Sequence, residues 1–159
     1  MCVGNDDDVR SVVLGPSGAL AGMKPGSILV DHTTASAEIA RELFDAAKKS
    51  GFDFVDAPVS GGQAGAENGQ LTVMCGGDQG PFDKANPVAM SFAKAITLIG
   101  PSGSGQITKM MNQMCIAGSR CLGHGVPRER TCPAKPHPRA TRQRWAISSV
   151  GIWHKERRS

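Results

Sequence analysis

Short apolar runs alternate with amphipathic stretches over the first 118 residues of the chain. Four of the apolar runs have the length and flanking residues of buried strands, at 27–31, 52–56, 71–75 and 95–99. Residues 1–4 have the character of the last residues of another strand. Strands that alternate with helical patterns predict an α/β sheet.

The clearest helical pattern follows Ser36, whose hydroxyl can cap a helix N-terminus. The apolar positions after it fall on one face of a helix, at Ile39, Ala40, Leu43, Phe44 and Ala47. Arg41 and Asp45 are spaced for an ion pair across one turn. Gly51 is expected to end this helix.

Three further helices are predicted. The acidic run at 6–8 suits the N-terminus of the first helix, because helix N-termini favour negative charge. Asp78 is expected to cap the second helix, which Pro87 disturbs. The third covers about 106–117 and has apolar spacing. Residues 58–69 are rich in glycine and small side chains, which predicts a long loop.

Composition changes at residue 119. Residues 119–159 hold ten of the 18 lysines and arginines but two of the 14 acidic residues, so they carry +8 while residues 1–118 carry −4. Hydrophobic periodicity ends there as well. Such a segment buries too little apolar surface to offset chain ordering, so disorder is expected, and the abrupt change also suits a shifted reading frame.

The length of 159 residues allows one domain with an appendage. No apolar run approaches the roughly 18 residues that a membrane span needs, and residues 1–10 lack the order of a secretory signal. The cysteines are odd in number and lack paired spacing, which predicts reduced thiols and a cytoplasmic location. They are Cys2, Cys75, Cys115, Cys121 and Cys132.

The first segment with candidate chemistry reads DAPVSGG at 56–62. It follows a predicted strand, and its glycines allow backbone N–H groups to turn toward an anion. Ser60 adds a hydroxyl donor beside Gly61 and Gly62, so the segment suits a carboxylate. A tight turn that needs positive φ explains the same glycines.

The second segment reads GSGQITKMMNQ at 103–113. Lys109, Asn112 and Gln113 lie three and four residues apart, so they share one helix face. Apolar neighbours would desolvate Lys109 and lower its pKa, which suits general acid/base chemistry. A solvated surface lysine is the alternative.

Together, the two segments resemble the substrate and catalytic signatures of the β-hydroxyacid dehydrogenases, which include 3-hydroxyisobutyrate dehydrogenase and tartronate semialdehyde reductase and are related to 6-phosphogluconate dehydrogenase. The sequence DHTT at 31–34 resembles the family's Asp-x-Ser-Thr, with Thr33 where serine is usual. The resemblance covers about residues 1–118 in the family's order.

This resemblance implies that NAD or NADP is the cofactor and that a small β-hydroxy acid and its aldehyde acid are interconverted. It implies that Lys109 is the general acid/base and that Asn112 positions it. Ser60, Gly61 and Gly62 would hold the substrate carboxylate. Thr34 and Asn5 would face the cofactor. No metal is implied, and full-length relatives are expected to be homo-oligomers.

The family pattern is incomplete in this sequence. The Gly-x-Gly-x-x-Gly turn that seats a dinucleotide pyrophosphate is missing, and residues 119–159 resemble no part of the family. The expected fold is therefore a partial doubly wound Rossmann-like sheet lacking its first strands (1–102), the start of a long interdomain helix (103–118) and a basic tail (119–159). We expect this shortened chain to be inactive alone.

Two other hypotheses concern the tail. Its cysteines and histidines have ligand chemistry for zinc, but their spacing matches no usual zinc pattern. They are Cys121, His124, Cys132 and His137. Its arginines, with two interleaved tryptophans, have the chemistry of a nucleic-acid-binding segment. The alternative function is therefore a non-catalytic nucleic-acid-associated protein on a dehydrogenase-like scaffold.

Overall fold

The computed structural model describes residues 1–123, 145–147 and 153–155, with side chains up to residue 118. Its helices are α1 (Asp6–Leu14), α2 (Ala19–Gly22), α3 (Ala37–Lys49), α4 (Gly62–Glu67), α5 (Gln79–Ala89) and α6 (Ser104–Gly123). Its strands are β1 (Ile28–Asp31), β2 (Asp53–Asp56), β3 (Val59–Ser60), β4 (Leu71–Gly77), β5 (Ala93–Gly100), β6 (Trp145–Ile147) and β7 (Trp153–Lys155).

The main sheet contains β1 to β5 and mixes parallel and antiparallel pairs. β1 pairs with β2 in parallel, and β4 pairs with β5 in parallel. β4 runs antiparallel to β2 at one end and to β3 further along. The fold class predicted from the sequence, a partial Rossmann-like α/β sheet, is confirmed.

The first residues of the chain lie along β1. The amino group of Met1 donates to the Val30 carbonyl at 2.8 Å, and the backbone N–H of His32 donates to the Met1 carbonyl at 2.8 Å. This is the bonding pattern of a parallel neighbouring strand. Residues 1–4 are not assigned to a strand, but Met1 occupies the place that the sequence predicted for a strand end.

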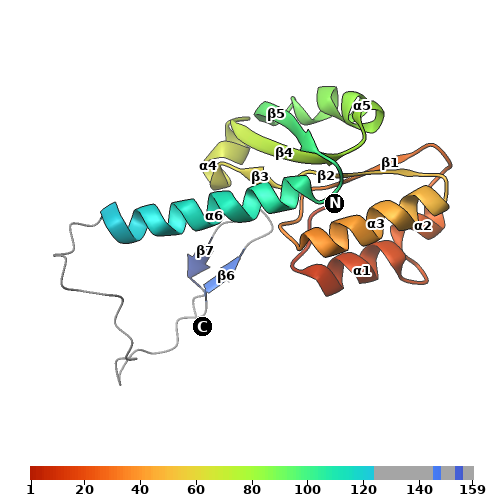
Figure 1. Cartoon of the computed structure of the whole chain (residues 1–159), viewed down its shortest axis with the longest axis horizontal. Helices are drawn as coiled ribbons and strands as arrows, with labels where there is room; N and C mark the ends of the chain where they lie inside the picture. The colour runs from red at the N-terminus through yellow and green to blue at the C-terminus, as the bar shows by residue number, and fades with distance from the viewer. Residues whose placement is uncertain (124–144, 148–152, 156–159) are drawn as a thin grey trace, which may run out of the picture.

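Helices cover both faces of the sheet, with α1, α2 and α3 below it and α5 above it in Figure 1. Alternate side chains along β2 point to opposite faces, so Phe54 packs with Leu43 of α3 while Val55 packs with Phe82 of α5. The apolar face predicted for the helix after Ser36 therefore forms one half of the core. The Ser36 hydroxyl accepts from the backbone N–H of Ile39, as a cap.

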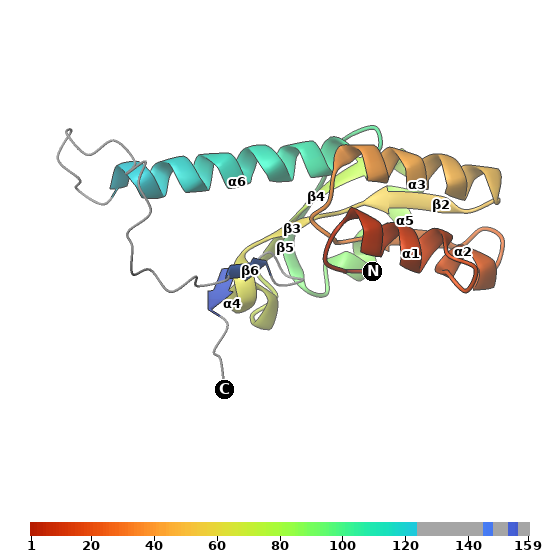
Figure 2. The same cartoon turned by 90° about the horizontal axis from the view of Figure 1, so that it is seen from below.

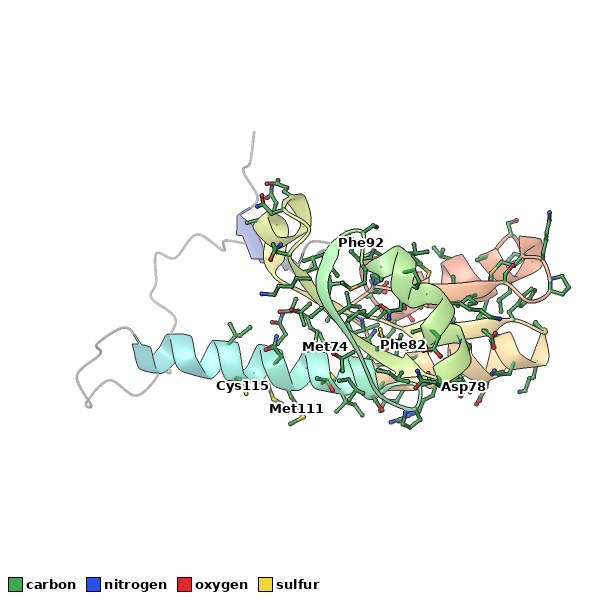
Figure 3. The ribbon with its side chains drawn as sticks, turned by 90° about the horizontal axis from the view of Figure 1, so that it is seen from above. Met74, Asp78, Phe82, Phe92, Met111 and Cys115 are labelled. Carbon is green, nitrogen blue, oxygen red and sulfur yellow. The ribbon has the colours of Figure 1, made fainter. Side chains whose placement is uncertain are left out.

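Helix α6 begins against β4 and continues beyond the sheet, as Figures 1 and 2 both show. Its first two turns bury Gln106 and Lys109. The opposite side of the helix is exposed, and Figure 3 shows Met111 and Cys115 pointing away from the sheet. The helix is longer than the predicted 106–117 at both ends.

The loop predicted at 58–69 is wrong, because the segment contains β3 and α4. Positive φ angles at Gly61 (136°) and Gly62 (65°) turn the chain sharply from β3 into α4. The glycines thus permit a compact strand-to-helix turn instead of preventing regular structure.

Two local predictions also need correction. Asp78 stands at the N-cap of α5 but makes no side-chain cap, because its carboxylate lies 2.9 Å from the Lys48 ammonium. Among the salt bridges of the described side chains, α3 uses Glu42 with Arg10 of α1, and the predicted pair of Arg41 and Asp45 is missing.

The disorder expected for 119–159 stays a prediction, although parts of this segment have assigned secondary structure. Helix α6 extends to Gly123, and β6 and β7 pair as antiparallel strands. The paired residues include Trp145, Ile147 and Trp153, and aromatic and β-branched residues favour strand pairing. The remaining tail positions lie outside the described residues. None of the described helices is long and apolar enough to cross a membrane.

Candidate functional site

A direct contact joins the two sequence segments with candidate chemistry. The side-chain amide of Asn112 on α6 donates to the Ser60 hydroxyl at the end of β3, at 3.2 Å. These residues are 52 positions apart in the sequence. The fold thus brings the DAPVSGG segment beside the helix that carries Lys109.

The glycines beside Ser60 have a clear conformational role. Gly61 has a φ of 136°, and a β-carbon there would lie 3.0 Å from Leu71 Cδ2. Gly62 has a φ of 65° and begins α4. The tight-turn explanation of these glycines is therefore correct, and it is compatible with a binding role for their N–H groups.

Lys109 is buried on the inner face of α6, one turn before Asn112. It is 3% exposed, and its ammonium takes part in none of the hydrogen bonds or ion pairs of the described side chains. Burial lowers the pKa of this amine below its ordinary value. The alternative of a solvated surface lysine is therefore wrong for this side chain.

Thr34 and Asn5 line one cleft with a volume of about 470 Å³, a size typical of small-molecule sites. The N-terminal turns of α1 and α3 meet there, and Met110 of α6 contributes to the wall. Because Met110 is the neighbour of Lys109 in the chain, this cleft borders the helix that carries the candidate acid/base. The two predicted cofactor-side residues are thus close to each other.

The side chain of Asn5 is already engaged. Its Oδ1 accepts from the backbone N–H of Asp8, and its Nδ2 donates to the Asp8 carboxylate. It is the N-cap of α1, a structural role for this side chain. Asp6, in the same turn, accepts from the backbone N–H and the hydroxyl of Ser36, which joins the N-termini of α1 and α3.

The cleft therefore carries carboxylates as well as helix N-termini. Asp6 and Asp7 both line it. Negative charge opposes a phosphate at this point, whereas carboxylates accept hydrogen bonds from hydroxyl groups. The residues present thus fit the ribose and ring portions of a dinucleotide better than its negatively charged pyrophosphate.

Residues 1–100 match the family model of the NAD-binding domain of 6-phosphogluconate dehydrogenase. The chain belongs to this family. The family and the cofactor class predicted from the sequence are thereby confirmed.

Comparison with individual proteins supports the same assignment. The chain is 61% identical over 117 residues to an uncharacterized oxidoreductase of Shewanella frigidimarina, and this alignment covers 74% of this chain and 40% of the relative. It is 45% identical over 121 residues to a probable 3-hydroxyisobutyrate dehydrogenase-like protein of Arabidopsis thaliana, covering 76% of this chain and 40% of the relative. The chain thus spans about 40% of the length of these relatives.

A solved structure gives the same result for the fold. Mycobacterium tuberculosis 3-hydroxyisobutyrate dehydrogenase, described with L-serine, aligns with a TM-score of 0.71 and 33% identity. The alignment covers 76% of this chain and 40% of that structure. The described fold is that of an oxidoreductase domain.

Two site residues of this NAD-binding family domain had no role in the sequence analysis. The carboxylate of Asp56 is fully buried and accepts from the backbone N–H groups of Gly103 (2.8 Å) and Gln106 (3.2 Å). Burial raises the pKa of the Asp56 carboxyl, and these hydrogen bonds oppose the rise. Asp56 thus belongs to the first segment and caps the helix of the second.

Gln106 is the other missed residue. Its side chain is fully buried, donating to the Thr33 carbonyl (2.7 Å) and accepting from the Ala35 N–H (3.1 Å). One amide thereby holds the peptide on both sides of Thr34 against α6. The available signal was the spacing of Gln106 three residues before Lys109, which places both polar side chains on one face of the helix.

The motif at 31–34 has a divided role. Asp31 and Thr33 are buried, and the Asp31 carboxylate accepts from the Thr33 N–H at 2.9 Å. His32 bonds the Ala57 carbonyl through Nδ1, and burial lowers the pKa of its ring. Only Thr34 of these four residues lines the cleft.

The tail hypotheses are not tested by the described side chains. The zinc candidates Cys121, His124, Cys132 and His137 and the tail arginines lie outside them. Within residues 1–118, no group of histidine, cysteine, aspartate and glutamate side chains is arranged to hold a metal ion.

Proposed function

We propose that this family domain serves the NAD- or NADP-dependent interconversion of a small β-hydroxy acid and the corresponding aldehyde acid, of the 3-hydroxyisobutyrate or tartronate semialdehyde type. The 3.2 Å contact between Asn112 and Ser60 supports the proposal, because it joins the glycine turn after β3 to the helix on which the buried Lys109 lies one turn before Asn112. L-serine, with which a relative is described, is itself a small β-hydroxy acid.

In this proposal, Ser60 and the N–H groups of Gly61 and Gly62 hold the substrate carboxylate. Hydrogen bonds to an ionised carboxylate are stronger than those between neutral groups. Asn112 orients the Ser60 hydroxyl and the reacting oxygen. The short turn at the two glycines fixes these donors on the sheet, which orients a bound acid before reaction.

Lys109 moves the proton at the reacting oxygen. In reduction, the Lys109 ammonium donates its proton to the carbonyl oxygen, and in oxidation the neutral amine takes the hydroxyl proton. Burial brings the pKa of Lys109 down, toward the range in which both forms are accessible. NAD or NADP supplies the hydride acceptor or donor when it is bound.

Thr34 and Asn5 hold the ribose and ring portion of that cofactor in the cleft beside Met110. Gln106 fixes the backbone around Thr34 relative to α6, so the proposed cofactor residue Thr34 and Lys109 keep a constant relative position. We further propose that complete proteins of this kind are homo-oligomers. A cytoplasmic location is proposed with them, supported by the reduced thiols of Cys75 and Cys115.

The carboxylate site can be tested by NMR titration of the ¹⁵N-labelled chain with 3-hydroxyisobutyrate. We expect shifts at the amides of Gly61 and Gly62 and at the Asn112 side chain. The matched neutral ligand is 2-methyl-1,3-propanediol, which replaces the carboxylate with a hydroxymethyl group and should leave these signals unchanged.

Two serine variants complete this test. Ser60→Ala should weaken binding of the acid by about fivefold, the effect of losing one hydrogen bond worth about 1 kcal/mol. Ser91→Ala is the control, because Ser91 is exposed and bonds only the Val88 carbonyl. Equal shifts with the acid and the diol, or none at Gly61 and Gly62, would contradict the proposed function.

A further inference from the structure

Lys109 differs from every other lysine of residues 1–118. It alone among them is buried, and it has no acidic partner in the described structure. Asp56, the buried carboxylate that contacts α6, already accepts from the backbone N–H groups of Gly103 and Gln106. Desolvation, and not a charged neighbour, sets the state of this amine.

An amine in this situation is a nucleophile as well as a base. Desolvation favours the neutral form, whose lone pair attacks carbonyl carbon, and lysines activated in this way form imines with carbonyl compounds. Exposed lysines remain largely protonated and react slowly at neutral pH. Lys109 also lies one helical turn before Asn112, whose side chain contacts Ser60.

We propose that Lys109 forms a reversible imine with small aldehydes that carry a carboxylate, in a pocket where Ser60 and the adjacent glycine N–H groups hold the acid group. The inference rests on the proposed function for the carboxylate pocket. It goes beyond that function because it assigns Lys109 a covalent reaction that needs neither NAD nor NADP.

The reaction is a condensation without oxidation or reduction. The ammonium of Lys109 loses a proton to solvent, and its nitrogen forms a bond to the aldehyde carbon while the carbonyl electron pair moves to oxygen. One proton then moves from nitrogen to this oxygen, which gives a carbinolamine. A proton from solvent on the hydroxyl oxygen lets water leave while the nitrogen lone pair forms a double bond to the former carbonyl carbon, and addition of water to the protonated imine reverses each step.

The imine can be trapped on the 159-residue chain with cyanoborohydride, which reduces it to a stable secondary amine. Glyoxylate and acetaldehyde form a matched pair of two-carbon aldehydes that differ in the carboxylate. Peptide mapping by mass spectrometry gives the occupancy at each lysine. Lys84 and Lys94 are exposed and provide internal references for the intrinsic reactivity of the two aldehydes.

We expect glyoxylate to modify Lys109 more than either reference lysine. The ratio of glyoxylate to acetaldehyde adduct should be about tenfold higher at Lys109 than at Lys84, as a charge-assisted hydrogen bond would give. Ser60→Ala should bring this ratio close to that of Lys84 without removing the acetaldehyde adduct. Lys109→Arg should abolish the modification at this position.

Equal ratios at Lys109 and Lys84, or no adduct at Lys109, would overturn the inference. The wild-type comparison of the two aldehydes decides this even if Lys109→Arg fails to fold. If 3-hydroxyisobutyrate shifts the Gly61 and Gly62 signals but glyoxylate leaves no adduct, the imine is wrong and the proposed function stands. If both experiments fail, the carboxylate pocket itself is wrong.

Discussion

Asp56 connects the two halves of the candidate site at the scale of single residues. In the sequence, Asp56 precedes the turn that contains Ser60. Its carboxylate accepts hydrogen bonds from the N-terminus of α6, the helix that carries Lys109. The backbone of β4 packs closely against the buried Asp56 carboxylate, because a β-carbon added at Gly76 would lie 2.6 Å from Asp56 Oδ1. Any change at Asp56 should therefore move Ser60 and Lys109 relative to each other.

We expect Asp56→Asn to destabilise the protein by about 1–3 kcal/mol at pH 7, because one of two backbone N–H donors then faces an NH₂ group. Urea unfolding followed by circular dichroism measures this. Asp45→Asn is the control, since Asp45 is exposed, and should change stability by less than about 0.5 kcal/mol. Equal effects of both changes would contradict the capping role of Asp56.

The same variant tests the raised pKa of Asp56. When the folded-state pKa lies above the ordinary value of 3.8, the folded state holds the proton to higher pH than the unfolded state. Stability from this group is then greatest below pH 3.8 and falls as the pH rises through the folded-state pKa. The wild type should lose stability relative to Asp56→Asn over that window, and a gain would contradict the raised pKa.

At the scale of elements, the packing of α6 against β4 depends on glycine. A β-carbon on Gly105 would press into the Met74 carbonyl oxygen and lie 2.8 Å from Asp56 Oδ2. Gly103 has a φ of 89°, at the turn into the helix. The glycines of the GSG sequence at 103–105 are thus explained by the close approach of a helix to a strand.

Two glycine-to-alanine changes on this one helix should have opposite effects. Gly105→Ala should cost about 2–3 kcal/mol, because the backbone oxygen it meets cannot move away easily. Gly118→Ala should stabilise by about 0.5–1 kcal/mol, because Gly118 is exposed, has open space around it and lies within the helix. Thermal unfolding of both variants checks the difference, and a neutral Gly105→Ala would show that α6 does not pack tightly on β4.

At the scale of the whole molecule, the described domain supplies only some of the parts that hydride transfer requires. The glycines at 61–62 form the turn between β3 and α4, and the glycines at 103 and 105 allow α6 to pack closely on the sheet. The chain spans about 40% of the length of its relatives. Correct placement of two reactants contributes about 7–11 kcal/mol to catalysis, so incomplete binding of either reactant is costly.

We therefore expect no measurable oxidation of NADH or NADPH by the 159-residue chain with tartronate semialdehyde or methylmalonate semialdehyde. Absorbance of the reduced nicotinamide measures this. Turnover that disappears in Lys109→Met would contradict the expectation and would show that the domain holds both reactants unaided. Turnover that persists in this variant would point to a contaminating enzyme.

The sequence by itself determined the fold class, the strands at β1, β2, β4 and β5, and the helix capped by Ser36. These follow from local periodicity and capping, which depend on neighbours within a few residues. It also identified Ser60, Lys109 and Asn112 as candidates through a family resemblance. The short elements β3 and α4 were missed, because glycine content indicates a turn but not what the turn joins.

Tertiary structure alone decided that Asn112 meets Ser60, that Asp56 caps α6 and that Gln106 holds the backbone around Thr34. Each contact joins residues about 50 to 70 positions apart, and no local pattern carries that information. It also decided that Lys109 is buried, because desolvation depends on how α6 lies against β4. The periodicity of the sequence predicts which face of a helix a side chain occupies, whereas the packing of the whole chain determines what covers that face.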